Sequence, residues 1–535
     1  MAESTMIEST LSIPDMATGS AYLSRLPLAN PAAAEQQLQQ FLDALLADPP
    51  QADTLLSLLE LARVPLCFVE EEMARRYHNK SLPLGTEEEA SFQLVLFTWE
   101  KMRRAYALCA QMAEPMAGDP QFNGLIATVL HRCLYYSAMV ILEHFRARRE
   151  LPAGIWTDLH QFYATAEHWG VANIPIEDAL ESNFQATHCT AAYVTILLID
   201  VASPYSNSVR NLNLIRRWAG LWAPLVSVLM LDDELEVPPY IIELNKDYPL
   251  HPTNNAENIG TDARRLDTSR LGLQLSHMLA QLRQRMTPSQ LGLGEETSGH
   301  VIKLLDHLSR PWTQAASPRR FRRFATVGSA RVATGFEAMH FHVSGQEFVQ
   351  SDAASAYSRD QFDKLFTFRD VANPGEKLNL RANTDFPVDD WSVINHSANG
   401  FRLARSSAGQ RITHSQLLSL CPHDGEHYLL AQASWLMEES DGGLLLGVSV
   451  LPGLPQAVAI RPVVAHDGIR ERFSRAFVLP AVPAIHEEAS LVLPKNIYQA
   501  SHIIELRSDG KNQQVRLKHI LQHGIDFDRC SFDLL

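Results

Sequence analysis

The residues best suited to ligand chemistry form an arginine cluster directly after Pro318. The cluster reads Arg319-Arg320-Phe321-Arg322-Arg323. Arg319 and Arg323 stand four positions apart in a stretch that we expect to be non-helical. Planar guanidinium groups can grip phosphate oxygens in pairs and can lie flat on a purine ring. The cluster therefore predicts contact with a phosphorylated ligand that carries a base.

A second polar motif follows a predicted strand over residues 391–394. It reads Asn395-His396-Ser397-Ala398-Asn399-Gly400. A short amide, a hydroxyl and a glycine in one turn bring polar groups and bare backbone close to the edge of a ligand. We interpret Asn395, Ser397 and Gly400 as its ligand-facing residues.

This order, Arg-x-x-x-Arg and then Asn/Asp-x-Ser-x-x-Gly on a small barrel, resembles the PilZ family of cyclic di-GMP receptors. The resemblance extends to a succession of short predicted strands with Trp435 near the middle. These strands cover 401–403, 409–412, 431–436, 446–450 and 458–461, the last of which would close the barrel. The part of the chain that resembles PilZ domains covers about a quarter of its length.

What the resemblance implies for the ligand is specific. Arg319 and Arg323 would wrap over cyclic di-GMP, and Arg320 or Arg322 would stack on a base. A second set, Asn395 and Ser397, would bond a guanine on the barrel side, while Gly400 would keep the turn open for close approach. The resemblance also implies a non-enzymatic bacterial receptor that acts on a protein partner in surface motility, type IV pili or biofilm control.

The spacing of the two motifs departs from compact PilZ domains, because about 70 residues separate them. We expect an insertion at about 345–385, with a short amphipathic helix over 358–366. A second copy of the Asp-x-Ser-x-x-Gly pattern, from Asp267 to Gly272, runs into a helical spacing of leucines. We therefore expect Ser269 on a helix and not in a ligand site.

The predicted fold is multidomain α+β. We expect a flexible tail over 1–30, a mainly helical domain over 31–311, a PilZ-like antiparallel β-barrel over 318–470, and a smaller C-terminal β extension over 471–535. Within the helical part, Thr86 and Glu89 predict a capping box at a helix start. Further helices are predicted over 122–149, 153–169, 176–200, 210–222 and 263–286, and a hairpin over 225–231 and 240–244.

Composition excludes several classes of protein. The chain has 535 residues, 46% hydrophobic and 20% charged, as expected of a globular protein of about three domains. A net charge of -15 disfavours binding of nucleic acid polymers. The longest apolar run, 191–199, is far shorter than the roughly 20 residues of a membrane helix, and the N-terminus lacks a secretory signal pattern. We expect a cytoplasmic protein without a transmembrane segment.

Each motif also has an interpretation without a ligand: the arginine cluster could be a solvated linker, and the Asn395 turn could be a plain hairpin. For the whole protein, the second hypothesis after a receptor is a scaffold whose barrel has lost its ligand. A phosphodiesterase or metal hydrolase is the third hypothesis, since no cluster of carboxylates and histidines supports catalysis. His340 and His342 fall on one face of a predicted strand, but zinc needs at least three protein ligands, so we predict no metal, no catalytic residue and no cofactor.

Overall fold

The computed structural model describes most of the chain. The described residues are 11–180, 186–231, 238, 240–253, 260, 262–314, 323–350, 386–406, 408–463, 472–508 and 510–535. The chain divides into two compact units, one of Met1–Arg320 with Met437–Asp441 and one of Phe321–Leu436 with Gly442–Leu535. The predicted fold class, multidomain α+β with a mainly helical N-terminal part followed by an antiparallel β-barrel, is confirmed.

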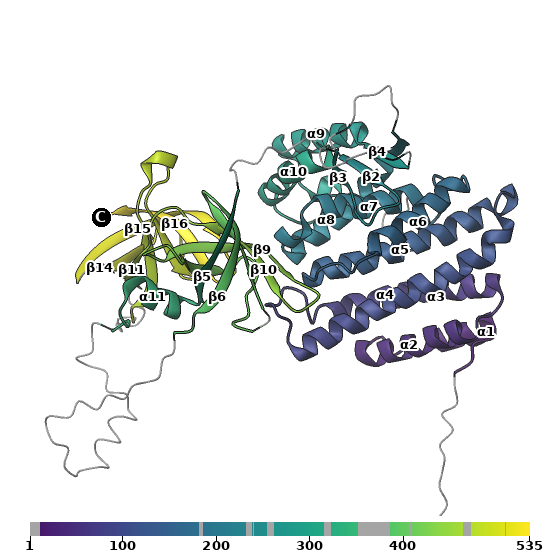
Figure 1. Ribbon diagram of the computed structural model, residues 1–535, viewed down its shortest axis with the longest axis horizontal. Helices are drawn as coiled ribbons and strands as arrows, with labels where there is room; N and C mark the ends of the chain where they lie inside the picture. The colour runs from purple at the N-terminus through teal and green to yellow at the C-terminus, as the bar shows by residue number, and fades with distance from the viewer. Residues whose placement is uncertain are drawn as a thin grey trace, which may run out of the picture. The chain divides into compact units, whose positions relative to one another are not determined.

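The first unit is built mainly of helices, of which α3, α4 and α5 lie side by side (Figure 1). The helices are α1 (Met16–Leu23), α2 (Pro31–Ala47), α3 (Ala52–Ala74), α4 (Thr86–Ala113), α5 (Asn123–Ala147), α6 (Ile155–His168), α7 (Cys189–Val201), α8 (Val209–Trp222), α9 (Ser269–Arg283) and α10 (Ser298–Trp312). One large apolar core joins them, with Trp99, Trp218 and Trp312 almost fully buried.

Three local expectations in this unit need correction. Residues 11–30 are not a tail, because α1 lies within them and Leu23 and Leu26 belong to the core. The cap of α4 is one residue earlier than predicted, since Glu88 accepts a hydrogen bond from the Gly85 amide at 2.7 Å. Among the described residues of the range 176–200, where a helix was predicted, only those of α7 are helical.

A small sheet accompanies the helices. Its strands are β1 (Ser227–Met230), β2 (Tyr240–Glu243), β3 (His251–Pro252) and β4 (Ala263–Asp267), in the order β1-β4-β2-β3. The predicted hairpin between 225–231 and 240–244 is therefore wrong, because β4 lies between its two arms. The predicted helix over 263–286 begins only at Ser269, whose amide donates to the Asp267 carboxylate at 3.1 Å. The second Asp-x-Ser-x-x-Gly copy thus lies at a helix start, as predicted.

The longest apolar helix is a core element. By length and composition alone, residues Pro120–Ala147 could cross a membrane, but 78% of their most apolar window is buried inside the protein. Within α5, one face carries polar side chains that the core must satisfy. Glu143 is 1% exposed and accepts hydrogen bonds from Arg146 at 2.7 Å and from the Tyr77 hydroxyl at 2.6 Å. Helix α5 is thereby explained by packing within the unit.

Glu143 makes the helical unit sensitive to acid. Burial alone would raise its pKa, but the Arg146 charge, the nearby His78 ring and the hydrogen bond from Tyr77 lower it from 4.5 to about 2. A depressed pKa stabilises the folded state above about pH 4.5, and this stabilisation is lost as pH falls towards 2. We expect Glu143→Gln to lose about 3 kcal/mol at pH 7 and less at pH 3. Urea unfolding, monitored by circular dichroism at 222 nm, measures the loss of stability at each pH. Equal losses at pH 7 and pH 3 would contradict the assignment of the acid sensitivity to Glu143.

The second unit contains two closed six-stranded barrels. The first consists of β5 (Phe324–Thr334), β6 (Asp389–Ser397), β7 (Gly400–Arg405), β8 (Leu417–Pro422), β9 (Leu429–Glu438) and β10 (Leu444–Val450), in the order β10-β7-β6-β5-β8-β9. The second consists of β11 (Gln456–Pro462), β12 (Ser474–Leu479), β13 (Ser490–Pro494), β14 (Ile503–Ser508), β15 (Lys511–His523) and β16 (Phe527–Leu534).

The C-terminal part is thus a complete barrel and more than an extension. Residues 458–461 do not close the first barrel, as predicted, but lie in β11 of the second, where Ile460 pairs with Ser474 and Leu506. Residues 409–412 form no strand of either barrel. The insertion's predicted helix over 358–366 lies outside the described residues.

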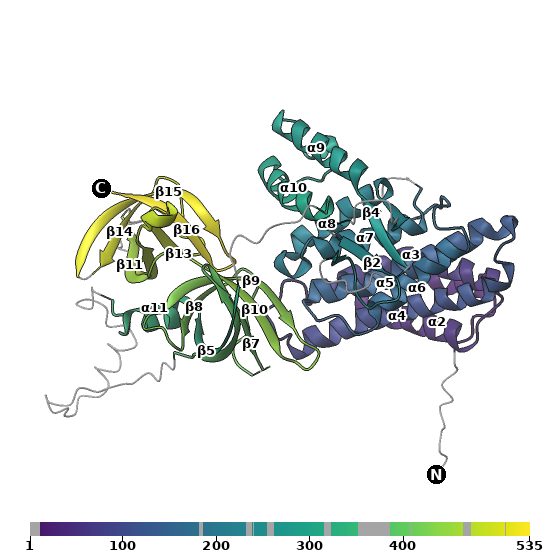
Figure 2. The same cartoon turned by 45° about the horizontal axis from the view of Figure 1, so that its top comes forward.

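The two barrels adjoin through helix α11 (Phe336–Ser344), which contacts β5 and β8 of one barrel and β11 and β12 of the other (Figure 2). Met339 of α11, Leu430 of β9 and Phe477 of β12 belong to one buried cluster. The predicted strand through His340 and His342 is wrong, since both lie on α11. Their Nε2 atoms contact the carbonyls of Val458 at 3.3 Å and Phe386 at 3.2 Å.

Candidate functional site

The strand register of the first barrel brings the end of the arginine cluster to the Asn395 motif. Strands β5 and β6 are antiparallel, with Phe324 opposite His396 and Ala325 opposite Asn395. Directly opposed residues in such a pair have Cα atoms about 4.5–5.5 Å apart. Arg323 precedes β5 immediately and is exposed. Arg319, Arg320 and Arg322 lie outside the described residues, so only Arg323 of the cluster is located.

A β-bulge in β6 determines whether the Asn395 side chain lies on the inner or the outer face of the barrel. Val393 is opposite the fully buried Leu403, whereas Asn395 is opposite Arg402, with a register shift between the two pairs at Ile394. Strict alternation would have put Asn395 on the buried face with Val393. The extra residue reverses this, so that Asn395 lies on the outer face of the barrel.

The same alternation gathers the other site residues on that outer face. Ser397 lies two residues beyond Asn395 and opposite Gly400, and Arg323 lies two residues before Ala325, the partner of Asn395. Side chains two positions apart in a strand share a face. Asn395 and Ser397 therefore lie on one face at one end of the barrel, and Arg323 precedes the strand that pairs with them there.

Ser397 and Gly400 also have roles within the hairpin itself. The Ser397 hydroxyl lies 3.1 Å from Asn399 Oδ1 and 3.4 Å from the Gly400 carbonyl, so it can donate within the turn. A Cβ atom on Gly400 would lie 2.3 Å from the Val448 carbonyl oxygen of β10. The glycine is thus required by the close approach of β7 to β10, whatever happens at the ligand.

Substitution of Gly400 tests this packing. We expect Gly400→Ala to push β7 from β10 and destabilise the first barrel by about 1–3 kcal/mol, the usual range for overpacking. Hydrogen exchange of the β7 and β10 amides measures it directly. Gly299→Ala is the control, because a Cβ there meets no atom within 4 Å. Unchanged exchange in the Gly400 variant would show that the strands can separate without cost.

A cation stacked on an aromatic ring extends the outer face. Arg402, opposite Asn395, is also opposite Gly447 of β10, and its guanidinium lies 5.6 Å from the centroid of the Trp435 ring. The Trp435 indole covers Gly447 so closely that a Cβ there would lie 1.8 Å from its Nε1. Within the described residues no acceptor reaches the buried Arg402 Nε. Arg402 was not predicted as a site residue, because only the strand register places it opposite Asn395.

An aromatic row occupies the other face of the same strands. Phe324, His396 and Phe401 are opposite one another across β5, β6 and β7. Their ring centroids are 5.8 Å apart for Phe324 and His396 and 6.1 Å apart for His396 and Phe401. Phe324 is 50% exposed. These three rings, which were not predicted as site residues, contact one another across the strand ends next to Arg323 and Asn395.

At the opposite end of β6 and β7 an ion pair fixes the two strands. The Arg405 guanidinium pairs with the Asp389 carboxylate and lies 4.7 Å from the centroid of the Trp391 ring. Burial lowers the pKa of Arg405, and the charge and hydrogen bond of Asp389 oppose this. Among the described residues no group of three metal-ligating side chains occurs. The groups that the described residues offer on the outer face near Asn395 are the Arg402 guanidinium, the Asn395 amide, the Ser397 hydroxyl and the Trp435 ring.

Comparisons with known proteins agree with this architecture. Three family models match in order: "Cyclic-di-GMP receptor FimW, N-terminal domain" over 17–233, "Cyclic-di-GMP receptor FimW, middle PilZ domain" over 240–373, and "FimW C-terminal beta-barrel domain" over 458–535. The last begins within β11, in line with the second barrel's own boundary. The middle match includes the arginine cluster and ends before Asn395.

A curated relative matches nearly the whole chain. It is the "Cyclic-di-GMP receptor FimW" of Pseudomonas aeruginosa, 23% identical over 543 aligned residues, which cover 93% of this chain and 86% of the relative. No solved structure matches. Because models of three successive FimW domains match in the same order, the chain belongs to the PilZ-domain family, in the three-domain form of FimW.

Proposed function

We propose that this protein is a bacterial receptor for cyclic di-GMP. The ligand binds to the outer face of the first barrel, where β5 and β7 begin and β6 ends. The strand register supports this most strongly, because Arg323 and Asn395, about 70 residues apart in the chain, adjoin through the pair of Ala325 and Asn395. Similarity to a protein named as a cyclic-di-GMP receptor supports the same ligand. The receptor carries out no chemistry on the nucleotide and works in the cytoplasm.

Each residue type has a defined task in this proposal. Arg319 and Arg323 donate paired, charge-assisted bonds to the phosphates or to the guanine Hoogsteen edge, and one bidentate arginine–guanine contact gives about 1–3 kcal/mol of discrimination. Arg320 or Arg322 stacks on a base. The amide of Asn395 and the hydroxyl of Ser397 bond a guanine edge.

Arg402 extends the proposed site beyond the family motif. Its guanidinium lies over the Trp435 ring, 5.6 Å from the ring centroid, and Arg402 is on the strand next to Asn395. Among the described residues no carboxylate forms an ion pair with it, so its charge is available to a phosphodiester. In a chain of net charge -15, such a local concentration of arginines favours a small anionic ligand over a polymer.

Calorimetric titration of cyclic di-GMP into the full-length protein tests the proposal, with cyclic GMP as the control ligand. We expect micromolar or tighter binding of cyclic di-GMP, and much weaker binding of cyclic GMP, which has one guanine and one phosphate. Absence of heat from a folded sample would leave the scaffold alternative. The internal roles of Ser397 and Gly400 favour that alternative, since the hairpin needs both residues even without a ligand.

Binding becomes a signal only if two states of the protein bind the nucleotide differently. The arginine cluster directly follows the helical unit in the chain, and we propose that its ordering around the ligand transmits the signal to that unit. The helical unit then acts on a protein partner in surface motility, pili or biofilm control. Helix α3 offers a surface for this, because Leu61, Val64 and Phe68 are 43%, 51% and 49% exposed at helical spacing.

A photo-crosslinking amino acid at Phe68, in the full-length protein in its own cells, tests the partner surface. We expect one cross-linked protein whose yield changes with the cellular cyclic di-GMP level. The same substitution at Leu273, a 73% exposed residue of α9, is the matched control. An identical cross-linking pattern from both positions would argue against a specific surface on α3.

A further inference from the structure

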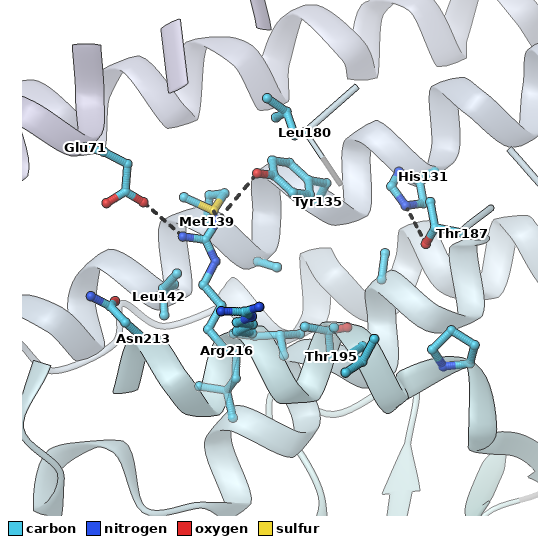
Figure 3. Close-up of a pocket in the computed structure, with 18 of the residues that line it drawn as sticks. Glu71, His131, Tyr135, Met139, Leu142, Leu180, Thr187, Thr195, Asn213 and Arg216 are labelled. Carbon is cyan, nitrogen blue, oxygen red and sulfur yellow. Dashed lines mark hydrogen bonds and ion pairs between the residues drawn. The ribbon is translucent and has the colours of Figure 1, made fainter. Parts of the chain in front are cut away.

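The helical unit contains a cavity that the proposed receptor site does not use. It has a volume of about 400 Å³ and lies among α3, α5, α7 and α8 (Figure 3). Ligand pockets commonly enclose about 300–1,000 Å³. Protein interiors are otherwise packed as densely as organic crystals, and a cavity costs stability. A cavity of this size in a helical core therefore suggests an occupant.

One wall of the cavity is apolar. It is formed by side chains of α5, α7 and α8, which leave room for a hydrocarbon or aromatic body. These side chains include Met139, Leu142, Ile196, Ile199 and Leu221. His131 also lines the cavity, 3.4 Å from the Thr187 hydroxyl. Burial and the neighbouring Arg132 lower the pKa of His131, so it is neutral and adds no charge.

The other wall is cationic. The Arg216 Nη1 atom lies 2.9 Å from Glu71 Oε1, while its Nη2 atom donates only to uncharged acceptors, the Tyr135 hydroxyl at 3.5 Å and the Met139 sulfur at 3.3 Å (Figure 3). The Arg216 side chain, although surrounded by protein, stays 27% exposed. It therefore has donor capacity that faces the cavity.

The carboxylates near this wall are too few for its guanidinium groups. Arg146 pairs with Glu143 at 2.7 Å and also with Glu71 at 3.1 Å, the same carboxylate that Arg216 uses. Arg217 lines the cavity as well, and no described carboxylate forms an ion pair with it. Arg146 and Arg216 thus share the Glu71 carboxylate, while the exposed Arg217 guanidinium has no described carboxylate, so an incoming anion can pair with donors of Arg216 and Arg217.

We propose that this cavity binds a small organic anion with an apolar body. A carboxylate or phosphate head bonds Arg216 and Arg217, and the body contacts Ile196, Ile199 and Leu221. The site lies wholly within the helical unit. It does not depend on cyclic di-GMP binding by the barrel.

Titration of octanoate into the full-length protein tests the proposal, with octyl phosphate to distinguish the head group and octan-1-ol as the uncharged control. We expect one saturable octanoate or octyl phosphate site per chain and binding of octan-1-ol weaker by about tenfold or more, the loss expected for a charge-assisted hydrogen bond. Equal affinity for octanoate and octan-1-ol, or no saturable binding of any probe, would overturn it.

Two variants locate the binding. Arg216→Gln should weaken octanoate binding by about tenfold, and Thr195→Phe should abolish it by filling the cavity from α7. Arg210→Gln is the matched control, because Arg210 lies on the same helix but is 71% exposed and pairs with Glu296 away from the cavity. Circular dichroism checks that each variant is folded, and cyclic di-GMP affinity should stay unchanged. Full octanoate affinity in the Arg216 variant would contradict the assignment.

Discussion

Replacement of both Arg319 and Arg323 by alanine is expected to lower the affinity for cyclic di-GMP at least about 100-fold. Each arginine is proposed to make charge-assisted hydrogen bonds, which contribute about 1.5–3 kcal/mol apiece. Two such losses exceed the 2.8 kcal/mol or so that corresponds to a factor of about 100. Calorimetry on the double variant and on each single variant measures the loss and apportions it.

Arg331→Ala is the matched control for this experiment. Arg331 lies within β5, eight positions beyond Arg323, and its guanidinium is 5.5 Å from the centroid of the Tyr428 ring. Its removal deletes one positive charge from the same strand but leaves the site end intact. If the control variant lost as much affinity as the arginine pair, general electrostatic attraction would account for binding and the motif would not.

Asp178→Ala is expected to destabilise the helical unit by about 3–5 kcal/mol, the cost of breaking a buried ion pair from one side. The Asp178 carboxylate lies 2.8 Å from Arg63 and 3.1 Å from Arg132, and all three side chains are almost fully buried. Burial alone would raise the pKa of Asp178, but Arg63 and Arg132 lower it, so it stays ionised near neutral pH. Without it, Glu60 is the one carboxylate among the described residues that still pairs with these two buried guanidinium groups.

Denaturant unfolding followed at 222 nm measures this loss, because the helices lie mainly in the first unit. Asp306→Ala is the control. Asp306 is 47% exposed and pairs with the 61% exposed Arg283, and such surface pairs contribute about 0–1 kcal/mol. Equal unfolding midpoints for the two variants would mean that water or local rearrangement satisfies the arginines that Asp178 leaves.

The type of most elements could be predicted from the sequence, whereas their partners could not. Apolar residues at helical spacing were enough to predict α4, α5, α6 and α8. The arms of the predicted hairpin contain β1 and β2, but β4, from 20 residues further along, pairs between them. Periodicity reports which face of a strand is buried and says nothing of which strand lies beside it.

The same limit explains the error at 458–461. The apolar alternation there correctly indicated a strand, yet the strand pairs with β12 and β14. Two successive barrels give the same local pattern as one barrel with an extension. Only closure of the first barrel between β9 and β10 excludes β11 from it.

The candidate site was predictable in its motifs and not in its geometry. Asn395 and Ser397 could be read from the sequence, but the bulge at Ile394 that directs them outward could not, because a bulge depends on tertiary pairing. Gly400 was interpreted as making room for a ligand, whereas β10 occupies the space beside it. Arg402 and Trp435, 33 positions apart, gave no joint signal at all.

Hydrogen exchange of the full-length protein, with and without saturating cyclic di-GMP, tests the central claim most directly. We expect cyclic di-GMP to slow amide exchange in peptides from the arginine cluster and the start of β5, and in peptides from residues 392–402. Exchange in the second barrel should change little. Protection confined to the helical unit or to the second barrel, at a concentration where calorimetry records binding, would contradict the proposed site.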